Sequence, residues 1–154
     1  MISNDCPQRS KYRMSFGVGG LMLNESLAVA QVYKPGESWA SARERLLAQG
    51  ASSLPKLASQ TRALREVYDR IGLLSESERH YLSAEADRAE QQAMIWLAIC
   101  RTYRFVQEFA VEVINERYQS WRLDLGPEVF DRFFAEKAEH DRSLAELSSS
   151  TSAK

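Results

Sequence analysis

Residues 85–122 read EADRAEQQAMIWLAICRTYRFVQEFAVEVINERYQSWR, and this stretch decides the fold class. It contains neither proline nor glycine, and its apolar residues recur at helical spacing. Two adjoining apolar faces result, one with Ile95, Ala98, Ile99, Val106, Phe109 and Val113, the other with Met94, Leu97, Phe105, Ala110 and Ile114. A helix that is apolar over so wide an arc needs neighbours on more than one side. The pattern predicts an all-α protein, a helical bundle around one long central helix from about Ala86 to Arg122.

The remaining sequence predicts shorter helices, and no useful length of strand-like alternation interrupts them. Their expected spans and end signals are 25–33 with Asn24 as N-cap, 38–49 between Ser38 and Gly50, about 56–72, a capping-box helix after Ser75, one from Pro127, and one holding Leu144 and Leu147. In the second of these, the packed face is predicted to hold Trp39, Ala42, Arg43, Leu46 and Leu47. In the third, the buried side is predicted to hold Leu57, Leu64, Val67, Ile71 and Leu74.

These elements suggest four parts along the chain. We expect a basic flexible arm over 1–13, an N-terminal helical lobe over 14–84, the central helix with a C-terminal lobe over 85–147, and a polar tail over 148–154. The tail is Ser/Thr-rich and stops without an apolar run.

The overall charge excludes a general attraction to nucleic acid. The 154 residues include 20 Lys and Arg against 21 Asp and Glu, so an anionic partner must be bound by a local patch. Cys6 and Cys100 have no metal or redox spacing, and Cys100 reads as a buried thiol in a reducing compartment. The N-terminus lacks a signal-peptide core, and charged residues interrupt the most apolar stretch, which predicts a soluble, cytoplasmic protein without a membrane span.

The helices over 38–49 and 56–72, joined by a tight glycine-containing connector, have the form of a helix-turn-helix. In a DNA-binding interpretation, the second helix presents its N-terminal part to the major groove. The residues that would bind there are Lys56, Gln60, Thr61, Arg62 and Arg65, with Arg70 reaching a phosphate and Arg9, Lys11 and Arg13 adding phosphate contacts from the arm. The alternative is an ordinary pair of packed helices with a solvated face, on which Glu66 and Asp69 dilute the positive charge.

Glu108, Glu112 and Glu116 repeat a carboxylate every four residues along the central helix. Like charges at this spacing repel, so we expect an ion-pair network with Arg101, Arg104, Arg117 or a basic residue from another helix. A di-metal site in a bundle would need Glu-x-x-His pairs, and neither histidine has a glutamate three residues before it. No nucleophile motif or P-loop is present either. We therefore expect no metal, no cofactor and no enzymatic activity; an enzyme would require a metal near Glu108 or Glu112.

Two segments resemble a bacterial protein family. They are SFGVGGLMLNES over 15–26 and WLAICRTYRFVQEFAVEV over 96–113. The family they resemble is BrxA, a component of the BREX phage-defence systems. Three further stretches fit it, namely Thr61-Arg62 with Arg65-Glu66, Phe130 to Lys137, and Leu147 to Lys154, so the resemblance covers nearly the whole chain from Tyr12.

The resemblance implies an all-helical protein with helix-turn-helix elements that binds double-stranded DNA beside other defence components, including a methyltransferase and ATPase-type proteins. The DNA-binding positions it implies are Lys56, Gln60, Thr61, Arg62 and Arg65. Members are often described as inner membrane proteins, which the charges in the central helix contradict. They also continue past the Ser/Thr-rich segment into further helices, so a second helix-turn-helix at the C-terminus would be incomplete here.

Together, these observations favour a non-enzymatic, DNA-binding accessory protein of phage defence with modest sequence preference. The alternative is an adaptor that assembles a methyltransferase or ATPase complex without touching DNA. One contiguous positive face would favour DNA, whereas an exposed apolar patch would favour a protein partner. The sequence leaves the oligomeric state open.

Overall fold

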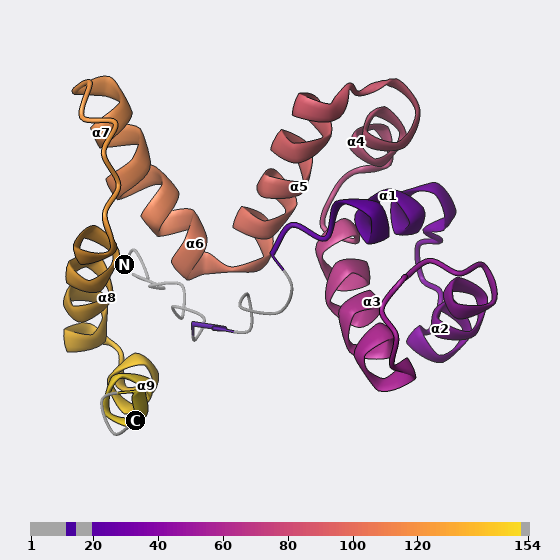
Figure 1. The fold of residues 1–154 in the computed structure, drawn as a ribbon, viewed down its shortest axis with the longest axis horizontal. Helices are drawn as coiled ribbons and strands as arrows, with labels where there is room; N and C mark the ends of the chain where they lie inside the picture. Colours follow the sequence, from indigo (N-terminus) through magenta and orange to yellow (C-terminus); the bar gives the residue numbers. More distant parts are fainter. Residues whose placement is uncertain (1–11, 15–19, 152–154) are drawn as a thin grey trace, which may run out of the picture. The chain divides into compact units, whose positions relative to one another are not determined.

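A computed structural model describes residues 12–14 and 20–151, and every regular element among them is helical (Figure 1). The elements are α1 (Leu23–Val32), α2 (Trp39–Ala48), α3 (Leu57–Ile71), α4 (Glu76–His80), the π-helical turn η2 (Tyr81–Glu85), α5 (Arg88–Thr102), α6 (Arg104–Phe109), the π-helical turn η3 (Ala110–Ile114), α7 (Asn115–Gln119), α8 (Pro127–His140) and α9 (Arg142–Thr151). The prediction of an all-α fold is confirmed.

The chain divides into two compact units. Of the described residues, 14 and 20–107 form the larger unit, and 12, 13 and 108–151 form the smaller one. The division falls within α6, whereas the sequence had suggested a lobe boundary between residues 84 and 85. Each unit has its own buried apolar side chains.

The core of the larger unit is organised around α1 and α3. Helix α3 packs against α1, α2 and α5, while α1 also contacts α4, η2 and α5 (Figure 1). Leu64, Val67 and Ile71 follow one another along the inner side of α3 and are fully buried, as their helical spacing predicts. Leu57 was expected there too, but 65% of it is exposed. The first buried residue of α3 is Ala63, so the opening turns of this helix project beyond the core.

Local signals set most of the helix starts. The Ser38 hydroxyl accepts a hydrogen bond from the Ser41 N–H at 3.3 Å, and Ser75 forms the predicted capping box with Glu78. The predicted Asn24 cap is wrong. Helix α1 begins at Leu23, and the bond from the Ser26 N–H to the Met22 carbonyl at 2.8 Å already belongs to it, so Asn24 lies inside the first turn.

The long helix expected from Ala86 to Arg122 is interrupted. Helix α5 ends at Thr102, Tyr103 is extended with φ −118° and ψ 103°, and a new helix starts at Arg104. Tyr103 is fully buried, with its phenol beside Arg70, so tertiary contacts stabilise the departure from helical geometry. Thr102 and Tyr103 are also weak helix formers, and the Thr102 hydroxyl satisfies the Ala98 carbonyl at 2.7 Å.

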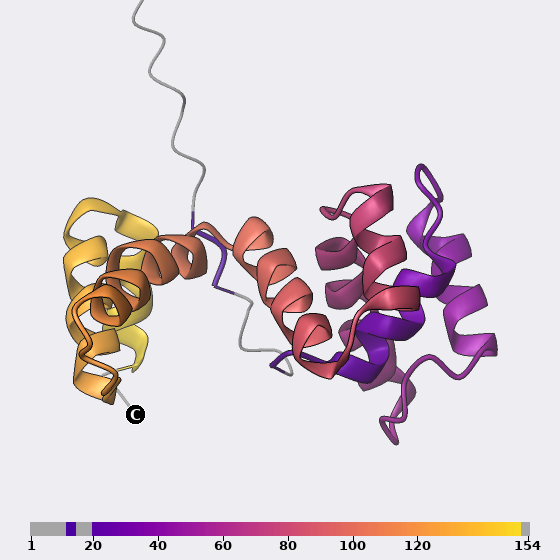
Figure 2. The ribbon, with the colours of Figure 1, turned by 90° about the horizontal axis from the view of Figure 1, so that it is seen from above.

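In the smaller unit, the helical run that begins in α6 ends at Gln119. Helix α8 then packs its aromatic face on Phe109, the last residue of α6. The ring of Phe109 lies 5.9 Å from that of Phe130 and 5.3 Å from that of Phe133, both in edge-to-face geometry. Helix α9 packs on α8 (Figure 2), and its backbone continues as a helix to Thr151, into the stretch expected to be a polar tail. An apolar layer between the helices therefore forms the core of this unit.

Candidate functional site

The hairpin of α2 and α3 positions the residues that the sequence assigned to DNA. Helix α2 ends in a Schellman motif, in which the N–H of Gly50 donates to the Leu47 carbonyl and the N–H of Ala51 to the Leu46 carbonyl, both at 3.1 Å. Gly50 has φ +65°, a left-handed conformation that costs glycine little. This ending leads the chain into the connector that precedes α3, which then packs against α2.

The exposed side of α3 carries the two predicted arginines. Arg62 and Arg65 are three residues apart, so they share one face of the helix, and both are exposed. Lys56, immediately before the helix, is exposed as well. Gln60 and Thr61 are half-buried, and the Gln60 amide donates a hydrogen bond to the Leu54 carbonyl in the connector.

Arg65 is held from two sides. Its guanidinium carbon lies 5.2 Å from the centre of the Trp39 ring, and its Nε is 3.1 Å from a carboxylate oxygen of Asp69. The arginine side chain remains half exposed, so it can still reach a partner in solution. The cation–π contact orients the guanidinium, whereas the carboxylate neutralises part of its charge.

Arg43, which the helical pattern predicts on the packed face of α2, is exposed. Arg43 follows Trp39 by four residues, so both lie on the same side of α2, the side on which Trp39 meets Arg65. The four-residue spacing of Trp39 and Arg43 in the sequence could therefore have added Arg43 to the candidate DNA-binding residues.

Arg70 does not reach solvent, and its predicted role in binding a phosphate is wrong. Only 1% of it is exposed, and its guanidinium donates to the Gly20 carbonyl at 2.9 Å and to the Tyr103 hydroxyl at 3.4 Å. Burial lowers the pKa of Arg70, and the nearby Glu66 carboxylate opposes that change. The closest approach of Arg70 Nε to Glu66 is 3.9 Å, which is too long for a hydrogen bond. Arg70 is therefore a buried structural residue, which joins α3 to Gly20 and to Tyr103 at the break between α5 and α6.

Of the predicted basic arm, Arg9 and Lys11 lie outside the described residues. Arg13 is described and exposed. The exposed cations on or beside the hairpin are Arg43, Lys56, Arg62 and Arg65, whereas Arg45 of α2 is half-buried and paired with Glu37.

The carboxylates predicted to need basic partners do have them. Lys137 of α8 lies 3.0 Å from Glu108 and 2.8 Å from Glu112, and the Tyr12 hydroxyl donates to Glu108 at 2.6 Å. Burial alone would lower the pKa of Lys137, but its hydrogen bonds to Glu112 and Glu108 outweigh burial and raise the pKa. The partner comes from another helix, one of the options left open by the sequence. Arg101 instead binds Glu78 in the larger unit, through contacts of 2.6 and 2.8 Å.

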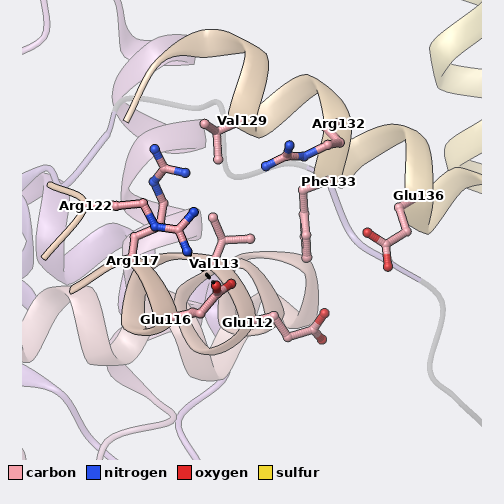
Figure 3. A pocket seen from close by; sticks show the side chains of 9 residues that line it. All are labelled: Glu112, Val113, Glu116, Arg117, Arg122, Val129, Arg132, Phe133 and Glu136. Atoms are coloured by element: carbon pink, nitrogen blue, oxygen red, sulfur yellow. Dashed lines mark hydrogen bonds and ion pairs between the residues drawn. The ribbon is translucent and has the colours of Figure 1, made fainter. Parts of the chain in front are cut away.

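A pocket of about 290 Å³ lies between the η3–α7 run and α8 in the smaller unit (Figure 3). Its lining combines three arginines, three glutamates and an apolar floor: Arg117, Arg122, Arg132, Glu112, Glu116, Glu136, Val113, Val129 and Phe133. Arg122 pairs with Glu116 at 3.4 Å across it. The charges balance, so the pocket has no strong preference for an anion or a cation.

Two kinds of site can be assessed over the described part of the chain. Residues 12–14 and 20–151 contain no group of three or more His, Cys, Asp or Glu side chains arranged to hold a metal ion. Among the same residues, no helix combines the length and the apolar character that crossing a bilayer requires.

Comparison with known proteins identifies a family. No curated protein and no solved structure matches the chain. The BrxA family model matches residues 10–154, which is nearly the whole sequence and includes both segments quoted for the resemblance. The chain belongs to the BrxA family and is thus a component of BREX phage defence.

Proposed function

We propose that this protein is a DNA-binding accessory protein of phage defence, and that α2 and α3 act as a helix-turn-helix whose exposed face contacts duplex DNA. The observation that carries the proposal is Arg62. It is exposed on the outer side of α3 and has no acidic partner among the residues that the structure describes. Arg65 stands one turn further along the same face.

The charge balance around the hairpin supports this assignment. Four cations are exposed there, Arg43, Lys56, Arg62 and Arg65. Against them stands one exposed carboxylate of the hairpin, Glu44 of α2. The acidic residues of α3 are less accessible, because Glu66 is half-buried near Arg70 and Asp69 is half-buried beside Arg65. The face is locally positive in a protein of net charge −1, as a phosphate-binding patch must be.

These contacts predict binding that is sensitive to salt and modest in sequence preference. Arginine and lysine side chains release counterions when they meet phosphates, but only a forked donor aimed at a base edge reads sequence. Gln60, which could read an adenine, already donates to the Leu54 carbonyl. Arg65 must exchange Asp69 for a phosphate, so Arg62 should contribute more to affinity than Arg65.

Fluorescence anisotropy of a labelled duplex, titrated with the protein at two salt concentrations, tests the proposal. We expect Arg62→Ala/Arg65→Ala to lower the affinity at least about tenfold and to reduce the salt slope by about 2, close to one unit per lost phosphate contact. The matched control is Arg88→Ala/Arg142→Ala, which removes the same charge from exposed positions on α5 and α9.

The control variant should keep most of the affinity. Equal losses in both double variants would mean that only total charge matters and would contradict a site on α3. Absence of binding by the unmodified protein at low salt would contradict DNA binding altogether.

A further inference from the structure

A row of packed side chains runs through the larger unit to the exposed face of α3. The guanidinium carbon of Arg65 lies 5.2 Å from the centre of the Trp39 ring, and that ring lies 5.7 Å from the ring of Tyr68. The Tyr68 ring lies 4.8 Å from that of Tyr33, over which the guanidinium carbon of Arg79 lies at 4.5 Å. Contacts at these distances are favourable between two rings and between a ring and a cation. Side chains from α4, the end of α1, α3 and α2 are thus connected in one row.

The two tyrosines of this row are held by the core of the larger unit. Tyr68 is 8% exposed, and its hydroxyl donates a hydrogen bond to the Lys34 carbonyl at 3.4 Å. Tyr33 lies against Gly72, where a Cβ would come within 2.8 Å of the tyrosine hydroxyl. Trp39 is half-buried and therefore packs on rings that several other contacts keep in place.

Packing on Trp39 changes what Arg65 loses when it binds a partner. Fixing a long, freely rotating side chain at an interface costs free energy. The ring restricts Arg65 before DNA arrives, while half of the arginine side chain remains exposed. The N–H on Nε is engaged by Asp69 at 3.1 Å, and the terminal N–H groups have no acceptor among the described residues. A phosphate can therefore take the place of Asp69 while the contact with the ring remains.

Arg62 provides an internal comparison for this arrangement. It lies three residues before Arg65 on the same exposed face, but no aromatic ring contacts it in the described part of the chain. Removal of the Trp39 ring should therefore weaken the contact made by Arg65 and leave that of Arg62 unchanged. A general disruption of the hairpin would weaken both.

We propose that Trp39 is a positioning residue for DNA binding, which holds Arg65 within reach of a phosphate and is itself supported by Tyr68 and Tyr33. This inference rests on the proposed function of α2 and α3. It adds that the affinity for DNA depends on an uncharged side chain that does not touch the duplex. One exposed cation–π contact corresponds to a factor of about two to five in an equilibrium constant, which is the size of effect expected here.

Fluorescence anisotropy of a labelled duplex at low salt tests the role of Trp39. Trp39→Met removes the ring and fills its space with a flexible apolar chain, so we expect a folded protein that binds about two- to fivefold more weakly. Trp39→Leu, a second variant without a ring, should show a similar loss, and Trp39→Phe, which keeps a ring, should bind more tightly than either. The matched control is Trp96→Met, which changes a partly exposed tryptophan on α5 and should leave the affinity unchanged.

Double variants separate positioning of Arg65 from a general structural effect. In an Arg65→Ala background, Trp39→Met should cause no further loss of affinity, because the guanidinium that the ring holds is gone. In an Arg62→Ala background, Trp39→Met should still cause its full two- to fivefold loss, as expected for independent contacts.

Two results would overturn the role of Trp39 and leave the site on α3 in place. One is an unchanged affinity in both ring-free variants while Arg65→Ala binds more weakly. The other is a loss from Trp39→Met that persists in the Arg65→Ala background, because the ring would then act on something other than Arg65. If Arg62→Ala/Arg65→Ala binds as tightly as the unmodified protein, the proposed site on α3 fails, and the role of Trp39 fails with it.

Discussion

Replacing Arg70 with methionine should destabilise the larger unit by about 3 kcal/mol, within the range measured when one partner of a buried charge pair is removed. Methionine keeps the length and flexibility of the stem but cannot donate to Gly20 or to Tyr103. The Gly20 carbonyl then lacks its bond from the guanidinium, at about 1–3 kcal/mol if it stays dry. Glu66, whose side chain is 12% exposed, would also lose its nearest cation.

Urea denaturation followed by far-ultraviolet circular dichroism measures this loss as a change in the free energy of unfolding. The companion variant, Arg70→Met/Glu66→Leu, removes the stranded carboxylate and should recover more than about 1 kcal/mol of the loss. If Arg70→Met lowered the free energy of unfolding by less than about 1 kcal/mol, Arg70 would not be the structural residue described above. If the double variant were no more stable than Arg70→Met, the Glu66 carboxylate would not be the cause of the loss in stability.

Two further predictions concern the ends of α4 and α5. Hydrogen bonds from Arg101 and from the Ser75 backbone lower the pKa of Glu78 to about 2, against an ordinary 4.5. The resulting stability is present above pH 4.5 and is lost as the pH falls towards 2. Arg101→Met should therefore lower the free energy of unfolding in urea at neutral pH, and the difference from the unmodified protein should shrink as the pH falls. Ser75→Ala removes the capping box of the five-residue α4 and should cost about 1 kcal/mol in the same assay, whereas Ser83→Ala, outside the cap, should cost less.

Sequence pattern predicted those parts of the fold whose causes are local. The caps at Ser38 and Ser75 and the start of α8 at Pro127 each depend on residues within one turn. The break at Tyr103 could not be predicted in this way, because it depends on burial beside Arg70, 33 positions earlier in the chain. The end of α7 was missed for a different reason, since Trp121 occupies a position where a glycine would have been the signal.

The candidate site likewise has features that the sequence could predict and features that depend on tertiary packing. The helical period correctly placed Arg62 and Arg65 on the outer face of α3, and it could also have shown that Arg70 lies inside, three residues after the buried Val67. The repeat of Glu108 and Glu112 predicted that basic partners exist. It could not identify Lys137, because that contact joins helices separated by a turn and the packing of α8 decides it.

The stacking of Arg65 on Trp39 gives the protein an optical signal of its own. Indole emission depends on nearby charge, and here a guanidinium lies 5.2 Å from the ring centre. A duplex that draws Arg65 towards its phosphates would change the light that Trp39 emits. In a background of Trp96→Phe and Trp121→Phe, that emission would come from Trp39 alone, so occupancy of α3 could be followed without attaching a dye to either molecule.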